Sequence, residues 1–266
     1  MHNTNTVTTD RAQRIMKETT RDRWIIAGLL LLGLVPALAG SARLSQMATG
    51  VPITAENARF FESPLPVLLH IPAAILYSVL GAFQFAPGFR KRHRRLHRIF
   101  GGLLIPASLV VAATGLWMAH FYAWPAGDGV IVYVERLIVG ILMLASIVMG
   151  IDAIRRRAFV AHGEWMIRAF AIGLGAGTQV FTHLPWFVLV DRAPGELPRG
   201  VMMGAAWLIN MVVAEVVIRR GRARQAVTRA TTFRTKGATM ATVGNATGQV
   251  VRQLRSHAEG NAALQP

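Results

Sequence analysis

The chain has 266 residues, of which 53% are hydrophobic and only 16% charged, and its formal net charge is +16. Soluble domains carry about 25% charged residues, so the deficit and the long uncharged runs point to insertion in a membrane. The chain has no cysteine, which excludes disulfides, iron–sulfur clusters, thiolate zinc sites and covalently attached c-type haem. Histidine and carboxylate side chains remain as candidate metal ligands.

Six apolar runs follow one another along the chain. A helix of about 17 residues, rising about 1.5 Å per residue, covers most of roughly 30 Å of hydrocarbon. All six runs must be helical, because lipid offers an open backbone no hydrogen-bonding partner. The sequence therefore predicts an all-α, polytopic bundle of six transmembrane helices. The runs are Trp24–Gly40, Leu65–Pro87, His97–His120, Val130 to about Asp152, Glu164 to about Val190, and Val201–Ile218.

These runs divide the chain into a basic N-terminal tail (1–23), a transmembrane domain (24–218) and a basic C-terminal tail (219–266). The C-terminal tail is rich in Arg, Thr, Ala and Gly without a sustained apolar period, so we expect it to be mostly disordered. The segment "PALAGSA", from Pro36, resembles a signal-peptidase site. The first run is nevertheless long enough to span the membrane, and we expect it to be retained as a helix.

The positions of Lys and Arg predict which side of the membrane each loop faces. Both tails, the junction after the second run and the loop after the fourth carry 23 of them, whereas the other three loops carry 4. The positive-inside rule then places both termini and the basic loops on the cytoplasmic side of the inner membrane. The most basic stretch, "RKRHRRLHRIFGG" from Arg90, is a topology anchor that also lies on anionic lipid headgroups. Its position argues against nucleic acid as the partner.

Five histidines in the runs fall into two layers by depth. His70, His120 and His183 lie toward the outer side, and His97 and His162 open the third and fifth runs at the cytoplasmic edge. Two such layers in a four-helix core would suit two haem b groups, each held by one histidine from each of two helices. Helical phase supports this in part, since His162 and His183 share a face whereas His97 and His120 are turned by about 140°. Histidine is also ordinary at membrane interfaces, so a structural role stays open.

We take His70, His97, His162 and His183 as candidate cofactor ligands, and His97 and His162 as the candidate metal ligands. His70 also begins a polar stripe in the second run, because Tyr77 and Gln84 follow it at intervals of seven residues. We expect this stripe to face protein rather than lipid.

Charged side chains within the runs need partners, because lipid does not solvate them. Arg168 and Glu215 lie at matching depths, so we expect them to form a structural ion pair, with Asp152 as the alternative partner. Glu135 and Arg136, near the outer edge, fit either a fold-fixing pair or part of a proton path.

Two further features predict close helix packing. Asn210 is most simply a hydrogen-bonding residue between helices, and "GLGAG", Gly173–Gly177, has the spacing of small residues that lets helices approach. The sequence contains no Ser/His/Asp, HExxH or P-loop pattern, so whether the protein is an enzyme stays open.

Two segments and one histidine carry a family resemblance: "LGAFQFAPGFRKRHRRLHRIFGG" from Leu80, "HGEWMIRAF" from His162, and His70. Together they resemble the domain-of-unknown-function 2306 family of predicted bacterial membrane proteins. The resemblance implies a multi-helix inner-membrane protein and brings no established activity, substrate or cofactor. Late in the fifth run, where that family often has a basic residue, this chain has His183. The family pattern falls on His70, Gln84, Phe85, Pro87, Arg90, His97, Arg98, Gly101, His162, Trp165, Met166 and Arg168.

The patterns together favour an electron-transfer or redox-associated membrane protein with histidine-ligated haem b, which exchanges electrons with a quinone. The alternative is a non-redox transporter of small molecules or protons, or an accessory subunit of a membrane complex.

Overall fold

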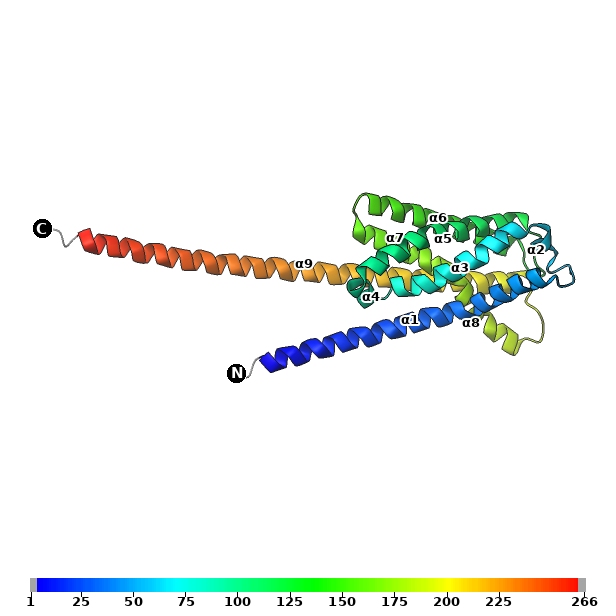
Figure 1. Ribbon diagram of the computed structural model, residues 1–266, viewed down its shortest axis with the longest axis horizontal. Helices are drawn as coiled ribbons and strands as arrows, with labels where there is room; N and C mark the ends of the chain where they lie inside the picture. Colours follow the sequence, from blue (N-terminus) through cyan, green and yellow to red (C-terminus); the bar gives the residue numbers. More distant parts are fainter. Residues whose placement is uncertain (1–3, 263–266) are drawn as a thin grey trace. The chain divides into compact units, whose positions relative to one another are not determined.

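The computed structural model describes the backbone of residues 4–262, and the side chains of residues 19–228 with a few others. The described backbone is helical and contains no strand, which confirms the all-α bundle expected from the sequence (Figure 1). Its helices are α1 (Thr4–Thr49), α2 (Ala58–Glu62), α3 (Pro64–Gln84), α4 (Pro87–Arg92), α5 (Arg94–Phe121), α6 (Val130–Arg155), α7 (Phe159–Gly173), α8 (Gly175–Leu189) and α9 (Glu196–Ala262).

The chain forms two units, Met1–Glu215 and Val216–Pro266. In the first unit α3 packs against α5, α6 packs against both α5 and α7, and α1 packs against α3 and α8. The second unit continues α9 as helix to Ala262, where the sequence analysis expected a mostly disordered tail. Arg, Ala and Gln have high intrinsic helix propensity, so a segment rich in them can be helical without an apolar period.

Five helical segments are long and apolar enough to cross a membrane: Thr19–Thr49 of α1, the whole of α3, α5 and α6, and Glu196–Thr228 of α9. The predicted fifth run does not form one such helix. It is divided between α7 and α8, each of 15 residues, and a helix of that length spans only about 22 Å. Six continuous spans are therefore not confirmed.

The break between α7 and α8 falls at Leu174, inside the "GLGAG" segment. The glycines there permit close contact with other helices. A Cβ at Gly175 would overlap the indole of Trp207 in α9, and one at Gly177 would overlap the backbone carbonyl of Leu32 in α1. The segment is thus packed tightly where three helices meet, as its small residues indicate.

Asn210 of α9 holds the two sides of this break together. Its Nδ2 donates to the carbonyl oxygen of Ala171 at 3.0 Å, near the end of α7. Its Oδ1 accepts a hydrogen bond of 2.8 Å from Thr178 Oγ1 in α8. These bonds supply partners for polar groups that lipid would leave unsatisfied, and they give Asn210 the interhelical role expected from the sequence.

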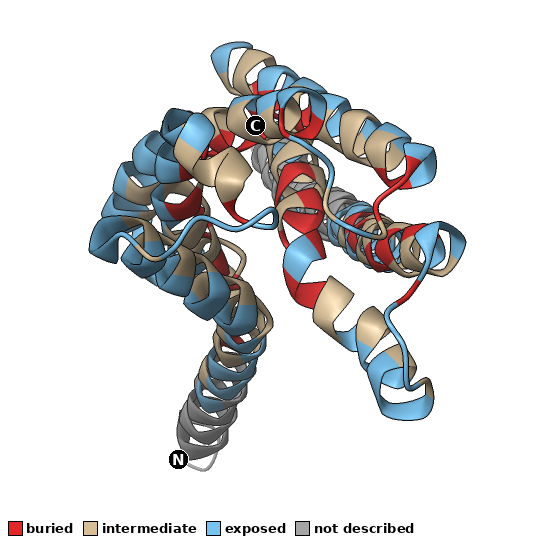
Figure 2. Ribbon diagram, turned by 90° about the vertical axis from the view of Figure 1, so that its right-hand side faces the viewer, coloured by how far each residue is buried: buried red, intermediate tan, exposed pale blue. Residues whose placement is uncertain are grey.

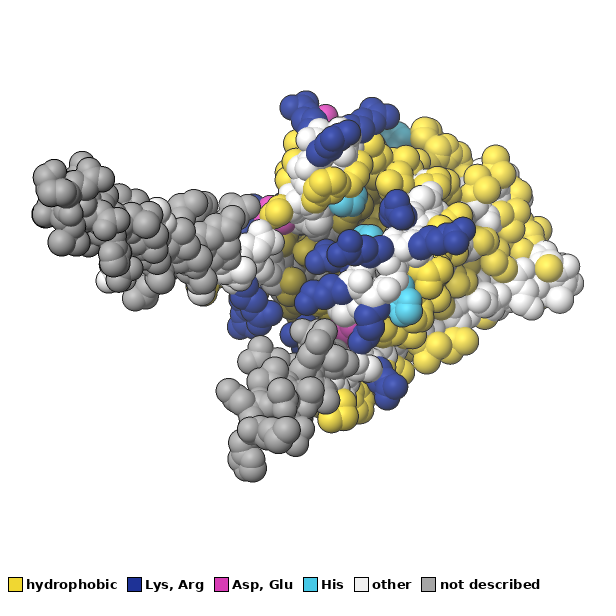
Figure 3. Space-filling model, turned by 60° about the vertical axis from the view of Figure 1, so that its left-hand side comes forward, with side chains coloured by type: hydrophobic (Ala, Val, Ile, Leu, Met, Phe, Trp, Pro, Cys, Tyr) yellow, Lys and Arg dark blue, Asp and Glu magenta, His cyan; other side chains and the backbone are white. Residues whose placement is uncertain are grey.

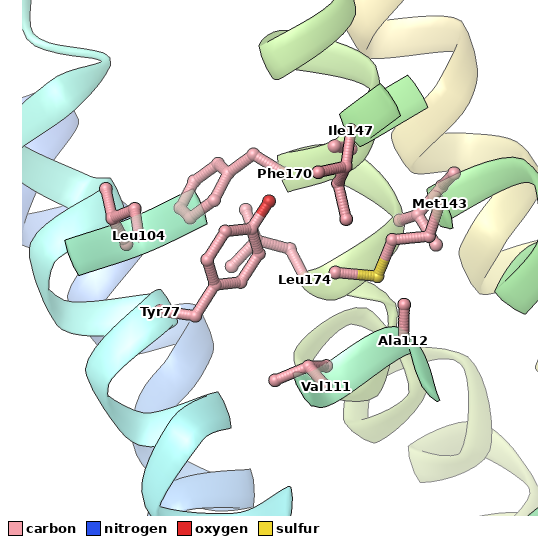
Figure 4. Packing of buried hydrophobic residues seen from close by; sticks show 10 residues of the cluster. Tyr77, Leu104, Val111, Ala112, Met143, Ile147, Phe170 and Leu174 are labelled. Atoms are coloured by element: carbon pink, nitrogen blue, oxygen red, sulfur yellow. The ribbon is translucent and has the colours of Figure 1, made fainter. Parts of the chain in front are cut away.

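The core of the first unit is apolar and centred on Phe170 (Figure 4). The Phe170 ring stacks on Phe85, with centroids 4.5 Å apart, and meets the edge of Tyr77 at 5.5 Å. Gly81 of α3 lies directly against this ring. Buried residues lie on the helix faces turned toward one another, and exposed residues on the outer faces (Figure 2).

Many of the exposed side chains are large and hydrophobic, for example Leu31, Ile138 and Leu208, as expected for helices that face lipid. Lys and Arg side chains gather at one end of the helices, with histidines among them (Figure 3). We call this the basic end; it comprises α4, the start of α5 and the turn between α6 and α7. The loop between α5 and α6 marks the opposite end.

Candidate functional site at the basic end

Three polar side chains meet at the basic end. Gln84 is the last residue of α3, and His97 and His162 lie in the first turns of α5 and α7. Gln84 Nε2 donates to the carbonyl oxygen of His97 at 2.8 Å, which ties the end of α3 to the start of α5. We call Gln84, His97 and His162 the His97 site.

The His97 site keeps polar atoms that no described residue satisfies. Gln84 Oε1 and His97 Nδ1 are buried without a hydrogen-bond partner among the described residues. His162 Nδ1 donates to the carbonyl oxygen of Gly150 at 2.9 Å, so in the neutral ring Nε2 carries the lone pair. The rings of His97 and His162 lie near each other. Buried polar atoms without partners are rare, and three groups with spare capacity at one place indicate a binding site.

Small residues and a cation–π contact surround this site, on α5, α6 and α7. Gly101, one turn beyond His97, faces the amide of Gln84, and Gly150 leaves room for the tip of Met166. The guanidinium of Arg168 lies 4.7 Å from the ring of Trp165. The residues in the two segments that carry the family resemblance thus gather near this end.

Arg168 forms a bidentate ion pair with Glu215. Its Nε and Nη2 donate to the two carboxylate oxygens at 2.6 and 3.2 Å. Asp152, the alternative partner considered from the sequence, pairs instead with Arg156 one turn away in the chain. The Glu215 side chain is 36% exposed, so the pair is only partly shielded from solvent.

Within the basic stretch, Arg92 links two helices, whereas His93 and Arg98 are exposed. Arg92 donates to Thr19 at 2.8 Å and pairs with the buried carboxylate of Asp22 at 3.3 Å, linking α4 to α1. Arg98 is exposed and makes no hydrogen bond or ion pair with the described residues, and His93 is exposed and packs on Phe89. Exposed cations at a membrane surface suit contact with anionic headgroups.

The outer histidines have separate partners. His70 Nδ1 lies 2.9 Å from Thr114 Oγ1 in α5. His183 Nδ1 donates to the backbone carbonyl oxygen of Gln179, in its own helix, at 2.8 Å. No hydrogen bond or ring contact joins His70 to His183 in the part of the chain described.

The opposite end holds a buried ion cluster that the sequence did not predict. The Asp128 side chain is 1% exposed; it pairs with Arg136 of α6 at 2.6 Å and with Arg199 of α9. Arg136 is therefore not paired with Glu135, whose Oε2 is buried without a hydrogen-bond partner among the described residues and lies near Gly204. Sequence spacing carried no signal for this cluster, because Asp128 and Arg199 are 71 residues apart.

No group of three or more His, Asp or Glu side chains is arranged to hold a metal ion within the described residues. The His97 site offers two histidines. Two protein ligands are too few for a typical structural zinc site, but they match the two axial positions of a haem iron.

The family model described as "Predicted membrane protein (DUF2306)" matches residues 67–218. The chain belongs to this family. The matched span reaches from α3 into α9 and includes the His97 site, the Asp128 cluster and the Arg168–Glu215 pair. The protein is therefore an integral membrane protein in contact with the lipid bilayer, and the family description names no activity. Neither the curated proteins nor the solved structures give a significant match.

Proposed function

We propose that the protein binds haem b at the basic end, with His97 and His162 as axial ligands, and takes part in electron transfer at the inner membrane. The observation that carries the proposal is the pair of half-buried histidines from two different helices, each with a ring nitrogen left without a partner. Haem supplies four equatorial nitrogens, so the protein needs to add only these two.

The surroundings of the two rings favour this use. Metal-binding histidines almost always donate their second ring N–H to a carbonyl, carboxylate or water, and His162 Nδ1 already donates to Gly150. Gln84 Oε1 is a spare acceptor beside His97, available to the N–H of that ring. His97 and His162 belong to the first turns of α5 and α7, which both pack on α6, so the two residues lie at the same end of the bundle.

The test is to purify the full-length protein from cells supplied with a haem precursor and to measure the Soret band and the haem per chain. We expect about one haem per chain in the wild type. His97→Ala and His162→Ala should each lose or spectrally alter it, because each removes an axial ligand. His93→Ala is the matched control in the same basic stretch and should keep the wild-type spectrum. Wild-type protein that contains no haem would refute the proposal.

Proton transport is a second candidate, favoured by one observation. The carboxylate of Glu135 lies within a membrane-spanning helix and has a buried oxygen without a partner among the described residues, and intramembrane carboxyl groups often serve proton relays. In liposomes with a trapped pH-sensitive dye, wild-type protein should then conduct protons and Glu135→Gln should not. Equal, background-level fluxes for both would exclude this function.

A further inference from the structure

A cavity of about 160 Å³ lies between α1, α3 and α8, beside His70. Most of its lining residues are small, so helix backbones rather than long side chains enclose it. A cavity of about 150 Å³ is known to hold one benzene molecule, so this one has room for a single six-membered ring with small substituents. The glycines and alanines of the lining are Gly33, Ala37, Gly40, Ala74, Gly173, Ala176 and Gly177.

Backbone interruptions shape the walls of the cavity. Pro36 in α1 has no N–H, so the carbonyl of Leu32 lacks its usual partner within the helix. Gly177 of α8 packs directly against that carbonyl, just past the break at Leu174. Because these interruptions fix the helix positions, side chains cannot easily collapse into the space.

His70 lines the cavity, and its contact with Thr114 leaves one ring nitrogen as a hydrogen-bond acceptor. Thr114 Oγ1 donates its proton to the carbonyl of Val110, so it can only accept from His70 Nδ1, 2.9 Å away. The ring N–H therefore points to α5, and Nε2 of the neutral ring keeps its lone pair. No described residue donates to it.

Ser78 adds a second polar group to the same wall. It lies two turns after His70 on α3 and lines the cavity, and its hydroxyl makes no hydrogen bond with the described residues. The rest of the lining is apolar apart from backbone. The cavity therefore combines a small apolar space with one acceptor and one hydroxyl, the composition typical of ligand sites.

We propose that this cavity binds one hydroxyl-bearing aromatic ring of the hydroquinone or phenol class, whose hydroxyl donates to His70 Nε2. Such a molecule dissolves in lipid and would enter from the bilayer, since α1 and α3 are both of membrane-spanning length. The proposal goes beyond haem binding and does not depend on it.

The first experiment compares two probes on the wild-type protein in lipid nanodiscs, under argon with ascorbate. Binding of 2-methylhydroquinone is measured by equilibrium dialysis, with empty nanodiscs subtracted. Its dimethyl ether, 2,5-dimethoxytoluene, has the same ring but no donor. We expect one saturable site per chain, and about fivefold weaker binding of the ether because it leaves the acceptor unpaired. Equal affinities, or no saturable hydroquinone binding, would overturn the proposal.

The second experiment uses matched variants. Ala37→Phe should fill the cavity and abolish saturable binding, whereas Ala39→Phe, exposed on the same helix, should not. His70→Phe should reduce hydroquinone affinity about fivefold and leave ether affinity unchanged, and His183→Phe should change neither. Wild-type affinity in Ala37→Phe or His70→Phe would contradict the assignment. If a variant fails to fold, the comparison of the two probes on wild-type protein decides.

Haem is kept out of these measurements by using protein from cells without added precursor. His97→Ala should bind 2-methylhydroquinone like the wild type, because His97 does not line the cavity. Wild-type protein that stays free of haem even when the cells are supplied with the precursor, and that binds the hydroquinone, would refute the haem proposal and support this one. Haem-loaded protein without hydroquinone binding would do the reverse.

Discussion

The two ends of the bundle use polar residues in different ways. At the opposite end, the buried carboxylate of Asp128 faces a guanidinium on each oxygen. At the basic end, His97 Nδ1 and Gln84 Oε1 are buried without partners among the described residues. A buried carboxylate that faces two cations contributes to the fold, whereas a neutral polar atom left without a partner is costly unless a ligand uses it. The difference distinguishes the ion-paired Asp128 cluster from the His97 site, which is proposed to bind a ligand.

The largest expected difference between the two ends is in the labelling of introduced cysteines. It is all-or-none, because only one end faces the outside of the cell. The chain has no cysteine, so single cysteines can be labelled without background. A membrane-impermeant maleimide added to intact cells should label Ala126→Cys, in the exposed loop at the opposite end, and not Arg95→Cys, because the basic end is predicted to be inside. Labelling of Arg95→Cys alone would invert the orientation.

At the opposite end, Asp128→Asn should lower the free energy of unfolding by about 3 kcal/mol, because it leaves two guanidinium groups without their carboxylate. Thermal or denaturant unfolding of the purified protein measures this. Asp191→Asn is the control, because Asp191 is an exposed acid in the loop between α8 and α9. It should change the free energy of unfolding by less than about 0.5 kcal/mol. Similar values for both variants would show that the Asp128 cluster is not structural.

For the Arg168–Glu215 pair we expect an intermediate effect. Arg168→Met and Glu215→Gln should each lower the free energy of unfolding by about 2 kcal/mol. This is less than expected for a fully buried pair, because the Glu215 side chain is 36% exposed. In a double-mutant cycle the combined variant should be more stable than the sum of the singles predicts, by at least about 1 kcal/mol. Strict additivity would mean that the two side chains do not interact.

The smallest effect is expected at the His97 site in haem-free protein. His97→Leu should be neutral or stabilise by up to about 1 kcal/mol, since it removes a buried nitrogen that has no partner. His162→Leu should instead destabilise by about 1 kcal/mol, because it breaks the hydrogen bond to Gly150. If His97→Leu proves as costly as Asp128→Asn, the contrast between the two ends fails.

The sequence predicted the membrane helices well because apolar runs of that length admit few other structures. It also predicted Arg168 and Glu215 as partners, since intramembrane charges at one depth need each other, and the structure pairs them. It did not predict the break at Leu174, because "GLGAG" is compatible both with a continuous close-packed helix and with an interrupted one. Packing against Trp207 and Leu32 accompanies the interrupted form here.

The site was predictable in its residue types and less so in its contacts. Depth alone grouped His97 with His162, but it also grouped His70 with His183, which have separate partners. Depth carries no information on which face of a helix meets which neighbour. For the same reason the Asp128 cluster was missed: Asp128 lies in a loop, and only the folded chain brings Arg199 beside it.

The interruption between α7 and α8 also bears on how the protein is made. Neither half is long enough to span the bilayer alone, and the carbonyl of Ala171 near the break is satisfied by Asn210, which belongs to the next helix in the chain. During synthesis the α7–α8 segment therefore reaches the membrane before its hydrogen-bonding partner exists. We therefore expect stable insertion of the α7–α8 segment to require α9, because α9 supplies that partner.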